Sequence, residues 1–358
     1  ASSAASDVYK RQMIISAIVI VAYTTLGGFL AASTTDFIQS IIMSVALIVV
    51  LIFGVETAGG IGAVIHNASE LPGYLSMTLS YDVNTGKAAP YSALTIVSTA
   101  AWGLGYFGMP HILLRFMAIE DEKKLKLSRR VATIWVVISL FVAVFIGVIG
   151  YTMSKVGALE MLTGSNSETI IVKISALLSQ HGVIFALLAG VILAGILAST
   201  MSTSDSQLLA ASSAVSSDIL GAFRKDSSNK NGSMAAARIT LLVISVVAAF
   251  IARNPDSSVF AIVSFAWAGF GAAFGPVVLF SLFWKRTNKW GALAGMVCGG
   301  SMVFIWKYLI RPLGGIWNIY ELLPAFLIAC AAIVIVSLLT PKPSKEIEEE
   351  FDRVAQMK

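Results

Sequence analysis

Residues 181–213 read HGVIFALLAGVILAGILASTMSTSDSQLLAASS and decide the class of protein. Their apolar first half extends far enough to cross most of a bilayer as a helix. The second half instead carries hydroxyl groups at i, i+3, i+4 and i+7, so these groups share one helix face. They are Ser199, Ser202, Thr203 and Ser206. Hard oxygen ligands suit a hard cation such as Na⁺, so the stretch predicts a membrane helix with an ion-binding face.

Two interpretations of this hydroxyl face stay open. Serine and threonine in membrane helices also hydrogen-bond to their own helix or let two helices pack closely. Asp205 lies close to the row and favours the functional interpretation, because an ionisable residue at membrane depth is costly. It could instead lie near the cytoplasmic exit of the helix, where a carboxylate costs little.

The composition indicates a polytopic membrane protein. Of the 358 residues, 57% are hydrophobic and 13% are charged, and the mean hydropathy is +0.83. The net charge of +5 does not indicate nucleic-acid binding, since it follows from the placement of Lys and Arg around the membrane. Cys298 and Cys330 lie in separate apolar runs, which argues against a structural disulfide. A membrane-embedded enzyme would need clustered His, Asp or Glu, and the sequence offers no such cluster.

Nine spans are expected along the chain. Residues 1–12, ASSAASDVYKRQ, lack an initial Met, an apolar core and a cleavage site, so we treat them as a foreign leader and not a signal peptide. Residues 13–340 then form the transmembrane domain, and residues 341–358 form a charged tail. The expected spans are 13–32, 37–55, 91–114, 131–153, 183–213, 237–252, 259–284, 291–309 and 320–339. A long loop rich in turn residues precedes residue 90, and a short amphipathic piece covers 168–178.

The placement of basic residues predicts the orientation in the membrane. Loops after the third, fifth, seventh and ninth spans, counted with their flanking helix ends, hold most of the 25 Lys and Arg residues. The positive-inside rule therefore places these loops and the C-terminus in the cytoplasm. The N-terminal end of the first span is then outside. An odd number of spans with an external start leads us to expect a chain that begins partway through a longer protein.

The expected third span contains the second unusual element, AWGLGYFGMPH at residues 101–111. Three glycines and a proline weaken a helix there, and unwound backbone at membrane depth is tolerated where it lines a cavity. Trp102 and Tyr106 stand at i, i+4 and would face the same way, as aromatic walls for a small zwitterion. A kinked helix with interfacial aromatic residues is the alternative, and it stays open. In the seventh span we expect small residues and a proline to give close packing and a kink. These are Gly269, Gly271, Gly275 and Pro276.

Three blocks resemble the sodium:solute symporter family, and its proline-transporting branch in particular: WGLGYFGMPHILLRFMA, MSTSDSQLLAASSAVSSDI and FAWAGFGAAFGPVVLFSLFWKR. The resemblance implies an all-α membrane protein with a leucine-transporter-like fold of two inverted five-helix repeats. It also implies Na⁺-coupled uptake of L-proline at the bacterial inner membrane by alternating access, without enzyme activity. The first helices of repeat one would be missing from this chain.

The resemblance also assigns site residues. It implies that Na⁺ is bound by Ser199, Ser202 and Thr203, and that the solute is bound by Trp102, Tyr106 and Pro110. Asp36 matches a family carboxylate linked to the ion. Because it follows Ser33, Thr34 and Thr35 and precedes an apolar run, it is equally a candidate N-cap. Two departures stand out: alanine is common in the family at the position of Ser199, and a hydroxyl residue at that of Asp205.

Two other functions compete with proline uptake as interpretations of the sequence. One is symport of another small solute, such as an osmolyte, a vitamin or a sugar, which the sequence does not exclude. The other is a membrane sensor that feeds a signalling domain. The charged tail argues against the sensor, because about twenty residues are too few for a kinase module. Neither interpretation requires a protein partner.

Overall fold

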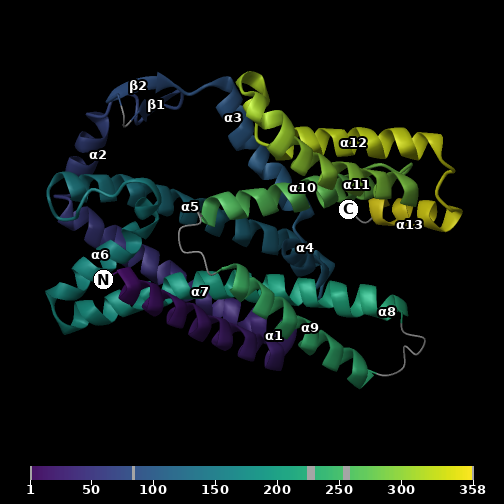
Figure 1. The fold of residues 1–358 in the computed structure, drawn as a ribbon, viewed down its shortest axis with the longest axis horizontal. Coiled ribbons are helices and arrows are strands. Elements are labelled where there is room, and N and C mark those ends of the chain that lie inside the picture. Colours follow the sequence, from purple (N-terminus) through teal and green to yellow (C-terminus); the bar gives the residue numbers. More distant parts are fainter. Residues whose placement is uncertain (1, 83–84, 224–229, 253–258, 357–358) are drawn as a thin grey trace. The chain divides into compact units, whose positions relative to one another are not determined.

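The protein is mostly helical and folds into two compact units (Figure 1). The computed structural model describes residues 2–82, 85–223, 230–252 and 259–356. One unit comprises residues 1–89 and 119–256, and the other comprises residues 90–118 and 257–358.

The first unit contains most of the helices. They are α1 (Ser2–Thr57), α2 (Ile61–Ser69), α5 (Leu125–Lys155), α6 (Ile170–Leu178), α7 (Val183–Ser213), α8 (Leu220–Phe223) and α9 (Lys230–Ile251). Short 3₁₀ segments lie at Glu122–Lys124, Gly164–Thr169 and Ser179–His181, and a π-helical turn lies at Ala214–Ile219. The loop before residue 90 adds a two-stranded sheet, β1 (Leu79–Asp82) with β2 (Lys87–Pro90), so the expectation of an all-α protein is wrong in this detail.

Helix α1 covers both of the first two expected spans and breaks at Gly28. There φ is 59° and ψ is −152°, a conformation open essentially to glycine alone. Tyr23 before the break hydrogen-bonds Asp205 of α7, and Ala46 after it packs against Gly195 of α7. In a straight helix Tyr23 and Ala46 would be about 35 Å apart, but their α7 neighbours are only about 15 Å apart. The chain therefore folds back at Gly28.

The polar turn expected at residues 33–36 is therefore misplaced. These residues are helical and follow the break at Gly28 by more than a turn. Thr34 Oγ1 donates to the Leu30 carbonyl and Thr35 Oγ1 to the Ala31 carbonyl, each at 2.9 Å, so both hydroxyls bond to their own helix. The N-cap interpretation of Asp36 is wrong for the same reason. Residues 2–12 form the first turns of α1, and the expectation that they are foreign stays a prediction.

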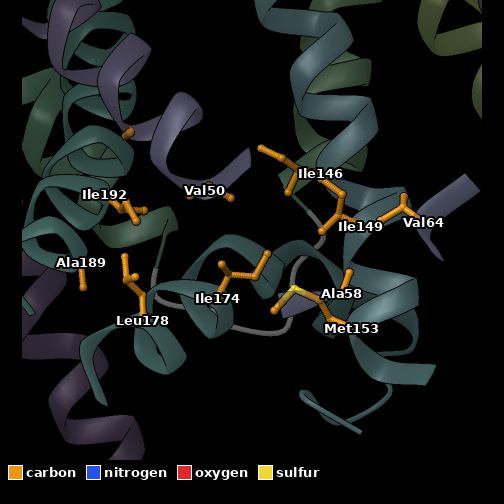
Figure 2. Packing of buried hydrophobic residues seen from close by; sticks show 11 residues of the cluster. Val50, Ala58, Val64, Ile146, Ile149, Met153, Ile174, Leu178, Ala189 and Ile192 are labelled. Atoms are coloured by element: carbon orange, nitrogen blue, oxygen red, sulfur yellow. The ribbon is translucent and has the colours of Figure 1, made fainter. Parts of the chain in front are cut away.

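The core of the first unit joins α1, α2, α5, α6 and α7 (Figure 2). Its side chains come from sequence positions far apart and are almost completely buried. They include Val50, Val64, Ile146, Ile149, Met153, Ile174, Leu178 and Ile192. The cluster fixes the amphipathic segment expected at 168–178, which forms the short helix α6.

The second unit contains α3 (Ala93–Ala100), α4 (Pro110–Met117), α10 (Val259–Phe283), α11 (Lys289–Ile305), α12 (Leu322–Leu339) and α13 (Lys345–Gln356). A π-helical turn (Trp306–Ile310) and two 3₁₀ segments (Arg311–Leu313 and Gly315–Asn318) link α11 to α12. Glycines let α11 approach its neighbours: Gly295 lies against Ile333 of α12, and Gly299 against the Ala272 backbone of α10. The charged tail forms α13, and Lys285 Nζ bonds Asp352 at 2.6 Å.

Seven helices in the described part of the chain are long and apolar enough to span a membrane. Two departures from the nine expected spans account for the difference. The first two fall within one continuous stretch, Ile14–Thr57, which folds back at Gly28. The third, at 91–114, is divided into short helices. The number nine stays a prediction.

Candidate functional site

The expected break in the third span is present in the structure. α3 ends at Ala100 and a 3₁₀ segment, η1 (Ala101–Gly108), follows it. Met109 is extended, with φ −82° and ψ 113°, and α4 begins at Pro110. Pro110 lacks an N–H and favours the first position of a helix, which explains where α4 starts. The sequence prediction that AWGLGYFGMPH leaves the α-helical conformation is therefore confirmed.

An aromatic cluster forms around Trp102 of η1. The Trp102 ring stacks on Trp267 of α10, with centroids 5.6 Å apart and planes 17° apart. Phe260 stacks on it at 5.5 Å and Tyr320 at 5.9 Å. Tyr106 meets Trp267 edge-on at 4.8 Å. The two aromatic residues predicted as walls therefore meet at a third, Trp267, which the sequence analysis missed although it lies in the glycine-rich AWAGFG stretch.

Trp102 and Tyr106 do not face the same way, so the expectation from α-helical spacing is wrong. In a 3₁₀ helix, with three residues per turn, residues four apart point about 120° away from each other. They come together through Trp267 instead, because it offers a face to Trp102 and an edge contact to Tyr106. Trp102 and Pro110 are half-buried, and Tyr106 is exposed.

Glycines make room for this arrangement. A Cβ on Gly105 would overlap the Trp267 indole, whose Nε1 donates to the Trp102 carbonyl at 2.9 Å. A Cβ on Gly271 would lie 2.7 Å from the Gly105 Cα. Close packing, as predicted for α10, is confirmed at Gly271 and also at Gly275, which lies against Phe326.

The hydroxyl face of α7 bonds partly to its own helix. Ser199 Oγ donates to the Ile196 carbonyl at 3.1 Å, and Thr203 Oγ1 donates to the Ser199 carbonyl at 3.2 Å. Such a bond uses the hydroxyl proton and leaves oxygen lone pairs available to a cation. Ser199 and Thr203 are exposed, and Ser202 is half-buried. The back-bonding and ion-binding interpretations are therefore compatible.

Asp205 is the one carboxylate of this stretch, and it is fully buried. Tyr23 Oη donates to its Oδ2 at 2.8 Å, and Ser206 Oγ donates to its Oδ1 at 3.2 Å. Full burial shows that the Asp205 carboxylate does not face solvent. Whether it lies at membrane depth or near the cytoplasmic end of the helix stays a prediction. Tyr23 was missed, since a tyrosine in an apolar run gives no sequence signal of its partner.

The proposed ion residues and solute residues belong to different units. Ser199, Ser202, Thr203 and Asp36 lie in the first unit. Trp102, Tyr106 and Pro110 lie in the second. The structure brings the solute residues together around one broken helix, and it places the three hydroxyl residues on one helix.

The chain is similar to curated bacterial transporters along most of its length. It is 38% identical over 94% of its residues to the osmoregulated proline transporter OpuE of Bacillus subtilis. It is 39% identical over 93% to the high-affinity proline transporter PutP of the same species. It is 36% identical over 96% to the sodium/proline symporter of Escherichia coli. The chain covers 65%, 66% and 65% of these relatives, or about two thirds of their length.

A solved structure shares the fold. It is that of a Na⁺-coupled sialic acid symporter in a substrate-bound, outward-open state, matched with a TM-score of 0.72 at 18% identity. The match covers 93% of this chain and 67% of that one. The family model described as "Sodium:solute symporter family" matches residues 3–299. With the relatives above, this match shows that the chain is an integral, multi-pass membrane protein and belongs to the sodium:solute symporter family.

Proposed function

We propose that the protein is a Na⁺-coupled symporter that imports L-proline by alternating access. The bacterial inner membrane is its proposed location, with the C-terminus in the cytoplasm. One observation carries the substrate: relatives 36–39% identical over more than nine tenths of the chain are named as proline transporters. These relatives are named as transporters and not as enzymes, and no covalent chemistry is needed.

The aromatic cluster supports proline as the solute. Proline is a compact, rigid zwitterion, so it loses little conformational entropy on binding and can be selected by shape. The Trp102 face can pack against the ring or attract the secondary ammonium through a cation–π contact. Tyr106 adds a second wall and a hydroxyl. Pro110 begins α4 directly after the extended Met109, where the backbone lies outside the helical pattern.

The hydroxyl face of α7 supports Na⁺ as the coupling ion. Ser202 and Thr203 would each supply a side-chain oxygen, and Ser199 would supply its backbone carbonyl, as alanine could in its place. Asp36, which the family resemblance links to the ion, would add negative charge that offsets the cost of bringing a cation into the membrane. Na⁺ is cargo here and not a resident cofactor.

Ion and solute would stabilise each other's binding. If Na⁺ raises the affinity for proline by some factor, proline must raise the affinity for Na⁺ by the same factor. Transport then follows because two forms of the protein, the one that carries both ligands and the empty one, switch between outward-open and inward-open states. A form that carries one ligand switches less readily.

The test is uptake of labelled L-proline by proteoliposomes that carry the protein expressed from its complete reading frame. An inward Na⁺ gradient should drive accumulation, and an equal K⁺ gradient should not. Unlabelled proline should compete, whereas betaine, glucose and sialic acid should not. Uptake driven by the K⁺ gradient alone would exclude sodium coupling. Sodium-driven uptake that betaine or a sugar abolishes, but proline does not, would assign another solute.

A further inference from the structure

Tyr320 connects the segment between α11 and α12 to the aromatic cluster. Its backbone N–H donates to Ser98 Oγ of α3 at 3.1 Å, and its hydroxyl donates to the Ser264 carbonyl of α10 at 2.6 Å. Its ring stacks on Trp102 with planes 15° apart. Figure 1 shows this segment beside α3. A residue fixed at both ends has little freedom to move the ring away from Trp102.

Ion pairs fix the position of Glu321, the residue directly after Tyr320. Glu321 is 1% exposed, and Arg311 Nη1 lies 2.8 Å from its Oε2. Lys307 Nζ is 3.9 Å from its Oε1 and 3.8 Å from the centre of the Phe265 ring. A buried carboxylate without partners would be costly, so these two cations hold Glu321 at the start of α12. The position of Tyr320 follows from that of Glu321.

Trp102 is also held from α10, where Phe260 stacks on its ring. Trp267 stacks on it and also donates to its carbonyl, so both the ring and the backbone of Trp102 are restrained from α10. Among the residues that the structure describes, Tyr320 is the one in the segment between α11 and α12 whose ring stacks on Trp102. Removing the Tyr320 ring would take away one ring that stacks on the Trp102 indole, so the indole could change its tilt.

We propose that Tyr320 is a positioning residue for the solute site: its ring sets the orientation of the Trp102 indole that contacts the solute. This rests on the proposed function, in which Trp102 binds the solute. Arg311 and Lys307 pair with Glu321, and Glu321 in turn fixes the position of the neighbouring Tyr320. A segment outside the broken helix thereby determines how tightly proline is bound.

The first experiment measures proline uptake. Tyr320→Leu should weaken the apparent affinity for L-proline about threefold to tenfold, as expected for loss of an aromatic pair. Tyr320→Phe keeps the ring and should restore affinity to within about twofold, because the stacking remains. The maximal rate should change little. Tyr308→Leu, in the same segment, is the matched control, since Tyr308 is exposed and packs against Phe265.

A double-mutant cycle tests the route of the effect. If Tyr320 acts through Trp102, Tyr320→Leu should cause no further loss of affinity in a Trp102→Ala background. Losses that multiply would overturn the proposal, as would an unchanged affinity in Tyr320→Leu alone.

The second readout does not depend on transport. In protein labelled with 5-fluorotryptophan, the ¹⁹F resonance of Trp102 is assigned by its absence in Trp102→Phe. Tyr320→Leu should shift that resonance, and Tyr308→Leu should not. An unmoved resonance overturns the positioning role whatever the substrate is. A shifted resonance, with proline affinity unaffected by Trp102→Ala, would instead show that the contact is real and that the proposed solute site is wrong.

Discussion

Tyr23 and Asp205 join α1 to α7 inside the first unit by a hydrogen bond of 2.8 Å. The carboxylate is fully buried, and its contact with Ser206 Oγ, at 3.2 Å, is longer, because that hydroxyl also donates to the Ser202 carbonyl at 2.9 Å. Tyr23 is therefore its main side-chain donor. If a buried carboxylate loses a hydrogen-bond donor, less of the free-energy cost of its desolvation is offset. The contact also ties α7 to the part of α1 before Gly28, on the opposite side of the fold-back from Ala46.

Replacing the donor should therefore destabilise the protein. We expect Tyr23→Phe to lower the free energy of unfolding by about 1–3 kcal/mol, because the Asp205 acceptor is left unsatisfied. Thermal unfolding of the purified protein in detergent measures the change. Tyr308→Phe removes an exposed hydroxyl and is the control. Equal melting temperatures for the two variants would show that the hydrogen bond contributes nothing.

The contact of Gly105 with Gly271 gives a second stability prediction. Gly271→Ala would place a methyl group 2.7 Å from the Gly105 Cα, so η1 and α10 would have to separate. We expect a loss of about 1–3 kcal/mol, typical of overpacking. Gly269→Ala, two residues earlier on the same helix, meets no atom within 4 Å and should be neutral or slightly stabilising. The prediction fails if both variants melt alike.

The sequence predicted features that depend on local chemistry. Apolar runs located the membrane helices, and Gly103, Gly105, Gly108 and Pro110 located the break that became η1. Prediction from the sequence failed where a structural feature depends on contacts between residues far apart in the chain. The reversal at Gly28 follows from packing against α7. The Gly27–Gly28 pair is a local turn signal, but the prediction placed the turn at the polar residues 33–36 instead. Trp267 and Tyr23 became site neighbours only through the fold.

Ion pairs at loop ends support a topology prediction. Lys155, at the end of α5, bonds Glu70 after α2, so these two positions lie on one side of the membrane. The hydrogen bond from Lys155 and its positive charge lower the pKa of Glu70. We expect this side to be external. In intact cells an impermeant maleimide should label Met77→Cys, at a residue 92% exposed, and not Lys124→Cys. Labelling of Lys124→Cys alone would reverse the orientation.

The sodium dependence of uptake should distinguish residues on the hydroxyl face of α7 that bind Na⁺ through a side-chain oxygen from the one that binds through its backbone carbonyl. Ser202→Ala and Thr203→Ala each remove a proposed ligand oxygen with little change in volume. Each should raise the Na⁺ concentration for half-maximal proline uptake by about tenfold, a change of about 1.4 kcal/mol. Ser199→Ala keeps the backbone carbonyl and should change it far less. If all three variants retain the original sodium dependence, the hydroxyl groups serve helix packing and the ion binds elsewhere.

The solute prediction tests the aromatic cluster directly. Trp102→Ala removes the ring that stacks on Trp267, and Tyr106→Ala removes the edge contact to the same indole. We expect each to weaken the apparent affinity for L-proline by at least about tenfold, or about 1.4 kcal/mol. The sodium response at saturating proline should change less, because the ion residues lie on α7. Phe107→Ala is the matched control, since Phe107 lies in the same 3₁₀ segment and its side chain is exposed.

Competition by larger amino acids shows whether the aromatic walls select the solute by shape. This competition should increase in Trp102→Ala and stay unchanged in Phe107→Ala. Intact proline affinity in both Trp102→Ala and Tyr106→Ala would make the broken helix a scaffold, with the solute bound elsewhere.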